Sequence, residues 1–181
     1  MMKFQGKGVY GAIAVGKVSL FRRQETQVRR VHADPASELE RLEKAKTKAT
    51  EQLSAIYEKA LVEVGETNAQ IFEIHMMMLE DDDYNESISS IIQTQNVNAE
   101  YAVAVTADNF AEMFSSMDDA YMQARASDVR DISNRLIVCL SDSGSSSSDT
   151  AEKTVICADD LAPSETVSLD KDKVLALECF P

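Results

Sequence analysis

Apolar residues recur every three or four positions through the middle of the chain, from Asp34 to Leu140. This spacing predicts amphipathic α-helices, and five such segments follow one another with short connections between them. Because short connections favour antiparallel neighbours, the pattern predicts a bundle of four to five helices.

The first predicted helix has a signal at each end. Asp34 is a suitable N-cap, and Pro35 suits the first helical position, where its missing N–H has no partner to lose. Gly65 is a suitable C-terminal cap, and Lys46 interrupts the apolar seam between these ends. The apolar seam of this helix consists of Leu39, Leu42, Ala49, Leu53, Ile56 and Ala60.

Four shorter helices are predicted after it. The second helix is predicted at residues 68–79, and the third begins at Asp82 or Asp83. The fourth is capped by Asn98, and the fifth runs from Asp118 or Asp119 to Leu140. The fourth should face inward with Ala99, Ala102, Val103, Thr106, Phe110, Met113 and Phe114. The fifth should keep its apolar period with Tyr121, Ala124, Val129, Ile132, Leu136 and Leu140.

The two ends of the chain follow a different pattern. Glycines separate short apolar stretches at 9–15, 18–21 and 27–31, which predict strands, and the serine-rich segment 141–150 predicts a flexible linker. A strand at 154–158, a short helix at 163–169 and a strand at 174–177 form a unit that suits a parallel sheet. Two strands do not make a stable sheet, so we expect the N-terminal strands to complete it.

These segments predict an α+β multidomain fold, in which an all-helical subdomain is inserted into an α/β domain. The predicted boundaries are 1–33 for the N-terminal strands, 34–140 for the helical subdomain, 141–150 for the linker and 151–181 for the rest of the α/β domain.

Negative charge is concentrated in one part of the chain. The formal net charge is −13, and residues 60–124 hold 13 of the 31 acidic residues without a single Lys or Arg. Such a segment fits either a solvated surface that promotes solubility or a docking surface for a cationic protein. It argues against nucleic acid as the main partner, since backbone phosphates need clustered cations.

Next to these acids, the run from Met76 to Leu79 is apolar at four consecutive positions, which covers more than one face of a helix. Some of its side chains must therefore point away from the bundle core, although a core-only arrangement could hide two or three of them. Methionine suits adaptable binding surfaces. Bordered by the acids at 80–83, the run resembles an interface with an apolar centre and a charged rim.

Other chemical signals are sparse. Neither of the two histidines, His32 and His75, stands beside a Cys or Ser motif, so the residues alone assign no catalytic role. The acids at 80–83 do not fit a calcium loop, because Glu86 and Ile92 occupy its Gly and Glu positions, and no metal is expected. Three widely spaced cysteines indicate reduced thiols in a cytoplasmic protein. No apolar run approaches the ~20 residues of a membrane span, so no membrane insertion is expected.

Four segments, in order and spread over nearly the whole chain, match the motifs of one known family. Residues 71–81 read IFEIHMMMLED, and a second segment, residues 117–132, contains MDDAYM and RASDVRDI. Residues 158–166 read ADDLAPSET, and residues 12–17 read AIAVGK. The chain therefore resembles the N-terminal region of enzyme I, the phosphoenolpyruvate-dependent kinase of the bacterial sugar phosphotransferase system.

The resemblance implies that the helical subdomain binds HPr, a small histidine-containing phosphocarrier, and is inserted into a swivelling α/β phosphohistidine domain. It also implies a role for Thr166, which would lie beside the active histidine and hydrogen-bond to it. The implied docking residues are Glu66, Gln70, Glu73, Ile74, His75, Met77, Met78, Asp81, Asp82, Asp83 and Tyr84, with Phe114 and Arg125 nearby.

The chain departs from the family pattern in two places. Tyr10-Gly11-Ala12 stands where the family has Ser-Pro-Gly, and the family's active histidine would be expected just beyond Pro181. The chain therefore resembles a truncated fragment that is inactive alone. The full-length protein would use phosphoenolpyruvate and Mg²⁺ in a following barrel and would form a homodimer through its C-terminal domain.

Two alternative functions stay open. One is the nitrogen-regulation paralogue of enzyme I. The other is a non-enzymatic helical adaptor that self-associates through the helix from Asp34 to Gly65, although Lys46 and the strand unit at 154–177 weigh against a simple coiled coil.

Overall fold

A computed structural model of the chain describes residues 13–21, 28–141, 153–158, 161–170 and 172–179. The chain divides into two compact units. The sheet unit comprises Met1–Gln24 and Ser147–Pro181, and the helical unit comprises Glu25–Ser146. In sequence, the helical unit therefore lies between the two segments of the sheet unit.

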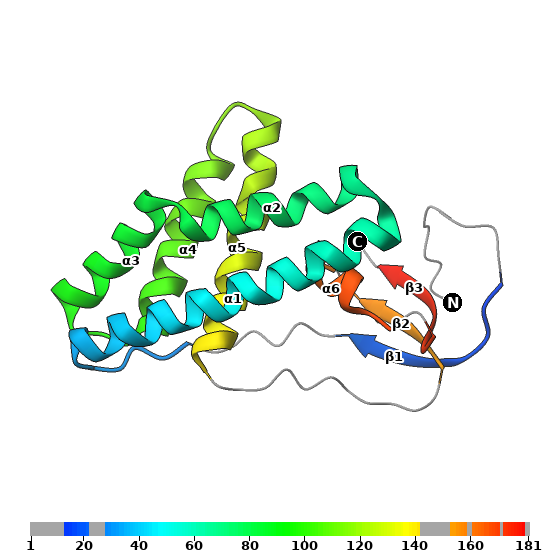
Figure 1. Ribbon diagram of the computed structural model, residues 1–181, viewed down its shortest axis with the longest axis horizontal. Coiled ribbons are helices and arrows are strands. Elements are labelled where there is room, and N and C mark those ends of the chain that lie inside the picture. The colour runs from blue at the N-terminus through cyan, green and yellow to red at the C-terminus, as the bar shows by residue number, and fades with distance from the viewer. Residues whose placement is uncertain (1–12, 22–27, 142–152, 159–160, 171, 180–181) are drawn as a thin grey trace, which may run out of the picture. The chain divides into compact units, whose positions relative to one another are not determined.

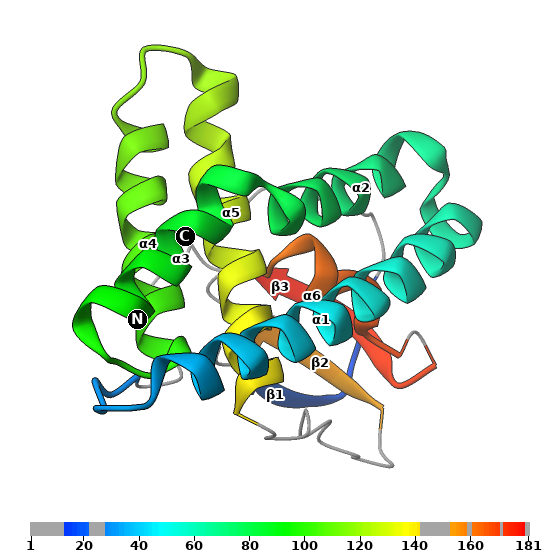
Figure 2. The same ribbon diagram turned by 60° about the vertical axis from the view of Figure 1, so that its left-hand side comes forward.

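Five helices make up the described part of the helical unit, in agreement with the periodicity of the sequence. They are α1 (Pro35–Val64), α2 (Glu66–Glu80), α3 (Asp82–Gln95), α4 (Ala99–Ser115) and α5 (Ala120–Leu140). Figures 1 and 2 show α1 and α2 as one antiparallel pair and α4 and α5 as a second pair, with α3 continuing from α2 toward α4.

The ends of α1 are formed as the sequence predicts. The Asp34 carboxylate accepts a hydrogen bond from the Ser37 backbone N–H at 3.0 Å, and Pro35 opens the helix. Gly65 separates α1 from α2 with a φ of 84°, in the left-handed region that favours glycine. A single residue therefore reverses the chain between the two helices.

Apolar side chains from all five helices fill the core. The fully buried ones include Leu42, Ala49, Leu53, Phe72, Leu79, Ile88, Ile92, Ala102, Val103, Ile132 and Leu136. Most of the apolar seam of α1 is thus used within its own bundle.

A polar cluster ties three helix ends together at one end of the bundle. Glu38 of α1 is buried and accepts from the Ala99 backbone N–H at 2.8 Å, where α4 begins. Arg41 donates to both Glu38 oxygens, to Glu100 at 2.6 Å and to the Leu140 carbonyl at 3.1 Å. The start of α1, the start of α4 and the end of α5 are therefore held to one another.

Three positions predicted to face inward are exposed instead. Met113 is 44% exposed, Tyr121 is 63% exposed, and Ala124 also faces solvent. The connection between α4 and α5 stands beyond α2 in both views, so the helical period continues there without a neighbouring helix to bury it (Figures 1 and 2).

The segment before α1 also differs from its prediction. Residues 28–31 form no strand, and residue 27 lies outside the described residues. Val31 instead exchanges hydrogen bonds with Asn98, donating to its side-chain oxygen at 2.9 Å and accepting from its backbone N–H at 3.0 Å. Asn98 therefore fastens the incoming chain and makes no side-chain capping bond to α4, although it occupies the N-cap position.

The sheet unit contains a three-stranded parallel sheet in the order β1-β2-β3. Its strands are β1 (Lys17–Phe21), β2 (Thr154–Ala158) and β3 (Val174–Cys179), and α6 (Pro163–Ser168) connects the last two. Lys17 pairs with Thr154, so the N-terminal strand completes the sheet as expected. Of the stretch predicted as a strand at 9–15, residues 13–15 are not in a strand and the rest lies outside the described residues, as do residues 142–152 of the linker region. None of the described helices is long and apolar enough to cross a membrane.

Candidate functional site

The outer face of α2 carries most of the residues that the sequence singled out. Successive residues of an α-helix are turned by about 100°, so a residue two positions on lies about 200° round the helix, on the opposite face. Met77 is 68% exposed on the face opposite the buried His75. Glu66, Gln70 and Glu73 share this outer face and are also exposed. The outer face of α2 is defined by these four residues.

The apolar run on α2 is divided between the core and the surface. Leu79 is buried, Met76 and Met78 are half-buried, and Met77 projects outward. Ile74 and Met78 lie on the same flank of the outer face and are half-buried, so they widen the apolar centre around Met77. The arrangement is an exposed thioether with apolar flanks on an otherwise acidic face.

An acidic corner follows where α2 meets α3. It consists of Asp81, Asp82 and Asp83, all exposed. The Asp81 side chain caps α3 by accepting from the Tyr84 backbone N–H at 2.9 Å. Carboxylates in the first turn of a helix are favoured by the helix dipole, so the same residues stabilise α3 and present negative charge to solvent.

A chain of aromatic rings connects this corner to α4. Tyr84 is buried, and its ring meets Phe110 edge-on at 5.7 Å between centroids, while Phe110 contacts Phe114 at 6.4 Å. The Tyr84 hydroxyl lies 2.7 Å from that of Ser133 on α5. Burial raises the pKa of Tyr84 to about 12. Tyr84 and the half-buried Phe114 are thus joined through Phe110.

Beneath the outer face, a polar cluster links α2 to α5. We call His75, Asp128, Asp131, Arg125 and Tyr121 the imidazole cluster. The ring nitrogens of His75 lie 3.6 Å from Asp128 and 3.7 Å from Asp131. Arg125 pairs with Asp128 at 2.7 Å, donates to the Tyr121 hydroxyl and stacks over the Tyr121 ring at 4.4 Å. Burial raises the pKa of Asp128, but the contacts with His75 and Arg125 lower it by more, so the pKa lies below its ordinary value.

The structure therefore separates the implied docking residues into two kinds. Glu66, Gln70, Glu73, Ile74, Met77, Met78 and the acidic corner are at least partly accessible, as are Phe114 and Arg125. His75 and Tyr84 are fully or almost fully buried, which corrects the expectation that their side chains touch a partner directly. These two residues can only support the surface from below.

The sequence analysis missed two residues of α5, Asp128 and Asp131. Asp128 and Asp131 are spaced by three residues, which places both carboxylates on one side of a helix. That spacing was a usable signal, but it does not say which residue on another helix they face.

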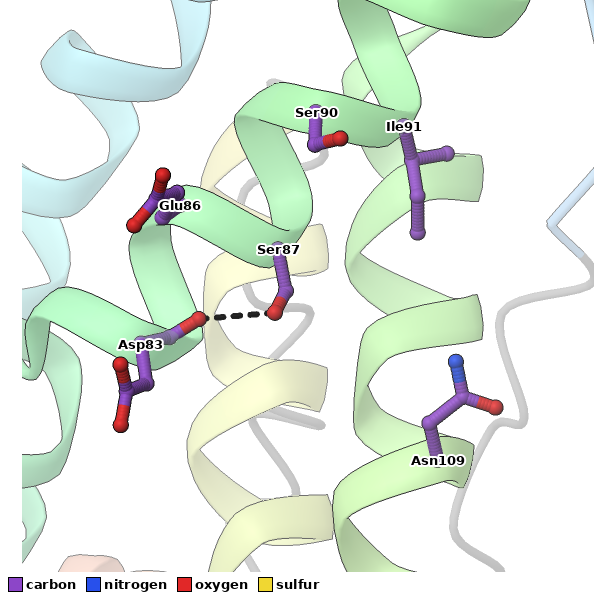
Figure 3. Close-up of a pocket in the computed structure, with 6 residues that line it drawn as sticks. All are labelled: Asp83, Glu86, Ser87, Ser90, Ile91 and Asn109. Carbon is purple, nitrogen blue, oxygen red and sulfur yellow. Dashed lines mark hydrogen bonds between the residues drawn. The ribbon is translucent and has the colours of Figure 1, made fainter.

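An open hollow extends the acidic corner along α3. Its volume is about 580 Å³, and it is lined by Asp83, Glu86, Ser87, Ser90 and Ile91 of α3 and by Asn109 of α4. Figure 3 shows these side chains, with the Ser87 hydroxyl turned back to the Asp83 carbonyl, to which it donates at 2.8 Å. The residues that the structure describes contain no group of His, Cys, Asp and Glu arranged to hold a metal ion.

Thr166 lies in the sheet unit, on α6. Its hydroxyl donates to the Ala162 carbonyl at 3.1 Å, and the Glu165 carboxylate accepts from the Ala162 backbone N–H at 2.7 Å. These bonds fix the first turn of α6. The expected bond from Thr166 to an active histidine stays a prediction.

A comparison with protein families identifies the chain. Residues 5–125 match the family described as "PEP-utilising enzyme, N-terminal". The chain belongs to this family. Its membership in the PEP-utilising enzymes confirms the resemblance that the four sequence motifs indicated.

Several curated relatives of the chain are named phosphoenolpyruvate-protein phosphotransferase. The protein from Geobacillus stearothermophilus is 43% identical over 147 residues, covering 81% of this chain and 25% of the relative. The protein from Bacillus subtilis is 34% identical over 176 residues, covering 96% of this chain and 31% of the relative. The chain thus spans between 25% and 31% of the length of these two relatives.

Solved structures of enzyme I proteins match the fold of this chain. A solution structure of Enzyme I (nEIt) matches with a TM-score of 0.74 and 32% identity, covering 90% of this chain and 67% of that one. The N-terminal domain of Enzyme 1 - Nitrogen matches with a TM-score of 0.69, and at 24% identity this likeness shows the fold alone. The mostly helical chain, with its small parallel sheet, therefore has the fold of an enzyme I N-terminal domain.

Proposed function

We propose that the chain is the N-terminal part of a phosphoenolpyruvate-protein phosphotransferase and that its helical unit docks HPr. The observation that carries this proposal is Met77, which is 68% exposed on a face whose other members are acidic or neutral. It lies within the segment 60–124, which has no Lys or Arg. Such a surface suits a partner with a basic rim around an apolar contact.

In the full-length protein, phosphoryl would pass from phosphoenolpyruvate to an enzyme histidine and then to a histidine of HPr. Transfer between two imidazoles depends on close approach and orientation more than on covalent help from side chains. The helical unit would supply the approach, and Thr166 would orient the enzyme histidine. Phosphoenolpyruvate, Mg²⁺ and the homodimer contact are assigned to parts of the protein outside this chain.

Charge and apolar contact would have separate roles in docking. The carboxylates should mainly raise the encounter rate, toward roughly 10⁸ M⁻¹s⁻¹ at low salt. Each exposed carboxylate adds about 0.2–1 kcal/mol to binding. The apolar centre at Met77 should hold more of the affinity, because truncation of a central desolvated contact costs most. A relay also needs release, so the interface should be transient and of modest area.

The alternative of a self-associating adaptor is not favoured by the structure. Leu42, Ala49 and Leu53 of α1 are fully buried within this chain's own bundle, so the apolar seam is not available to a second copy. The nitrogen-regulation paralogue fits less specifically, because the likeness to that structure is 24% identical and shows the fold alone.

Reversing the charge of the acidic corner tests the electrostatic part of the proposal. In Asp81→Lys/Asp82→Lys/Asp83→Lys, the Kd for purified HPr should rise about tenfold or more at low salt, because three carboxylates become repulsive. The matched control is Glu43→Lys/Glu51→Lys/Glu58→Lys, which makes the same change of net charge at exposed positions of α1. Calorimetric titration at ~50 mM and ~300 mM salt measures both variants.

The two variants must differ for the proposal to stand. The control should change the Kd by less than about threefold, and high salt should shrink the effect of the corner variant. Equal Kd values for both variants, or a Kd of the native chain that is independent of salt, would contradict docking at the acidic corner.

A further inference from the structure

His75 is a buried titratable residue for which direct docking gives no role. Its side chain is fully buried, and neither ring nitrogen has a hydrogen bond of ordinary length among the described residues. Nε2 instead lies 3.6 Å from an Asp128 oxygen, and Nδ1 lies 3.7 Å from an Asp131 oxygen. Each side of the ring therefore faces its own carboxylate.

This geometry selects one protonation state of the ring. A neutral imidazole carries one N–H and one lone pair, so one of the two carboxylates would face a lone pair. An imidazolium carries an N–H on both nitrogens and can point one at each carboxylate. The two contacts are favourable together only when His75 is protonated.

Charge balance in the imidazole cluster favours the same state. Arg125 pairs with Asp128, and their side chains are each 13% exposed, while that of Asp131 is 14% exposed. Arg125 offsets the charge of Asp128, and a proton on His75 adds a positive charge that faces both carboxylates. Burying a charge without compensation is costly, so the proton on His75 stabilises the closed cluster.

The other elements packed against α2 direct their polar groups elsewhere. From α1, Tyr57 lies beside Glu73 on the outer side of α2, and the Glu73 carboxylate raises the pKa of Tyr57. From α3, the Tyr84 hydroxyl bonds to Ser133, and Asp81 caps α3 itself. On α5, Arg125 reaches Asp128 and Tyr121. Both carboxylates that contact the imidazole therefore come from α5.

A shared metal ion does not explain the cluster. The two carboxylates approach opposite nitrogens of one ring, so the imidazole lies between them and the three groups cannot converge on a common ion.

We propose that His75 is a positioning residue for the docking surface: as an imidazolium between Asp128 and Asp131, it locks α2 onto α5 and thereby fixes the direction in which Met77 and Glu73 project. The part of this inference that concerns partner binding rests on the proposed function. A neutral ring would turn a lone pair toward one of the carboxylates, which would loosen α2 on α5 and weaken binding of the partner.

The test compares His75→Gln with His32→Gln, a matched control at an exposed position whose structural contact is a backbone bridge to Val97. The Kd for HPr is measured at about pH 6 and about pH 8.5, a range that spans histidine titration. Between about pH 6 and about pH 8.5, the Kd of the native chain and that of the control should rise about fivefold more than the Kd of His75→Gln. Titration of HPr itself is common to all three and cancels in the comparison.

A second measurement does not depend on the partner or on the variant folding. Nitrogen-15 NMR of the native chain should show two N–H groups on the His75 ring at neutral pH. Amide hydrogen exchange in α2 should accelerate as the second N–H is lost.

Each outcome has one meaning. A ring with a single N–H at neutral pH, or a pH dependence unchanged in His75→Gln, overturns the lock while leaving docking intact. Absence of HPr binding at every pH overturns the proposed function, and the NMR result then still decides whether His75 locks α2 to α5.

Discussion

Met77 and His75 are two residues apart on α2, yet the helical turn gives them opposite environments. Met77 is 68% exposed, and His75 is completely enclosed between α2 and α5. One residue can meet a partner, and the other can only hold the helix that presents it. At the scale of single residues, adjacency in a motif therefore says little about a shared role.

Tyr84 gives a prediction at this scale, because it joins the acidic corner to the core. Its folded pKa of about 12 exceeds the ordinary value of 10.0, so its stabilising effect is complete below pH 10 and is lost as the pH rises toward 12. At pH 8, Tyr84→Phe should lower the free energy of unfolding by about 1 kcal/mol, because the substitution removes the bond to Ser133. Above pH 10, its free energy of unfolding should fall less steeply than that of the native chain.

Urea unfolding followed by circular dichroism at about pH 8 and pH 11 measures both effects. Ser133→Ala is the control: it removes the same hydrogen bond but should keep the steep fall above pH 10, because the Tyr84 phenol stays buried. Parallel pH curves for the native chain and Tyr84→Phe would contradict the burial argument.

The sequence alone could predict an outward methionine but not which one. Four consecutive apolar residues guarantee that some face solvent, whereas the choice of Met77 depends on where α5 lies. Met113 was predicted inward because helical periodicity does not show where a neighbouring helix ends. The contact between His75 and Asp128 joins residues 53 positions apart and leaves no local signal.

At the scale of helices, the sequence was more informative. Asp34-Pro35 and Gly65 mark the ends of α1 as predicted, because caps satisfy backbone groups locally and need no information about the rest of the fold. Asn98 shows the limit of this reasoning. It occupies the N-cap position of α4, but its side chain binds Val31 in the segment that leads into α1.

The polar cluster around Glu38 gives a prediction at the scale of helices. Glu38→Gln should lower the free energy of unfolding by about 2–4 kcal/mol, because it weakens the pair with Arg41 and the bond to the Ala99 backbone N–H inside the protein. Glu40→Gln is the matched control on the same turn of α1. Its partner Lys44 is 73% exposed, so a change of no more than about 0.5 kcal/mol is expected.

Chemical denaturation of the two variants measures both changes in the free energy of unfolding. A Glu38→Gln chain as stable as Glu40→Gln would show that the cluster does not hold the helix ends together.

At the scale of the whole molecule, the chain should take no phosphoryl group from phosphoenolpyruvate by itself. It has two histidines, of which His75 is fully buried between carboxylates, and His32 lies on the segment before α1. Two carboxylates face the His75 ring and would repel a phosphoryl donor, and the nearby Arg125 guanidinium is already paired with one of them, Asp128. Incubation with phosphoenolpyruvate and Mg²⁺, followed by mass spectrometry under conditions that preserve phosphohistidine, should find none.

The full-length relative from Geobacillus stearothermophilus serves as the positive control in that experiment. Phosphohistidine at His32 or His75 would contradict the expectation and would require a donor site within the helical unit.

The pairing of β1 with β2 has a consequence for how the chain is made. Lys17 meets Thr154, so 136 residues must leave the ribosome between the two partners. Synthesis of that length takes roughly 7–27 s at 5–20 residues per second, whereas helical bundles with mostly local contacts fold in microseconds to milliseconds. The bundle can therefore assemble first and bring the distant halves of the sheet within reach, while the nascent N-terminal strand waits unpaired.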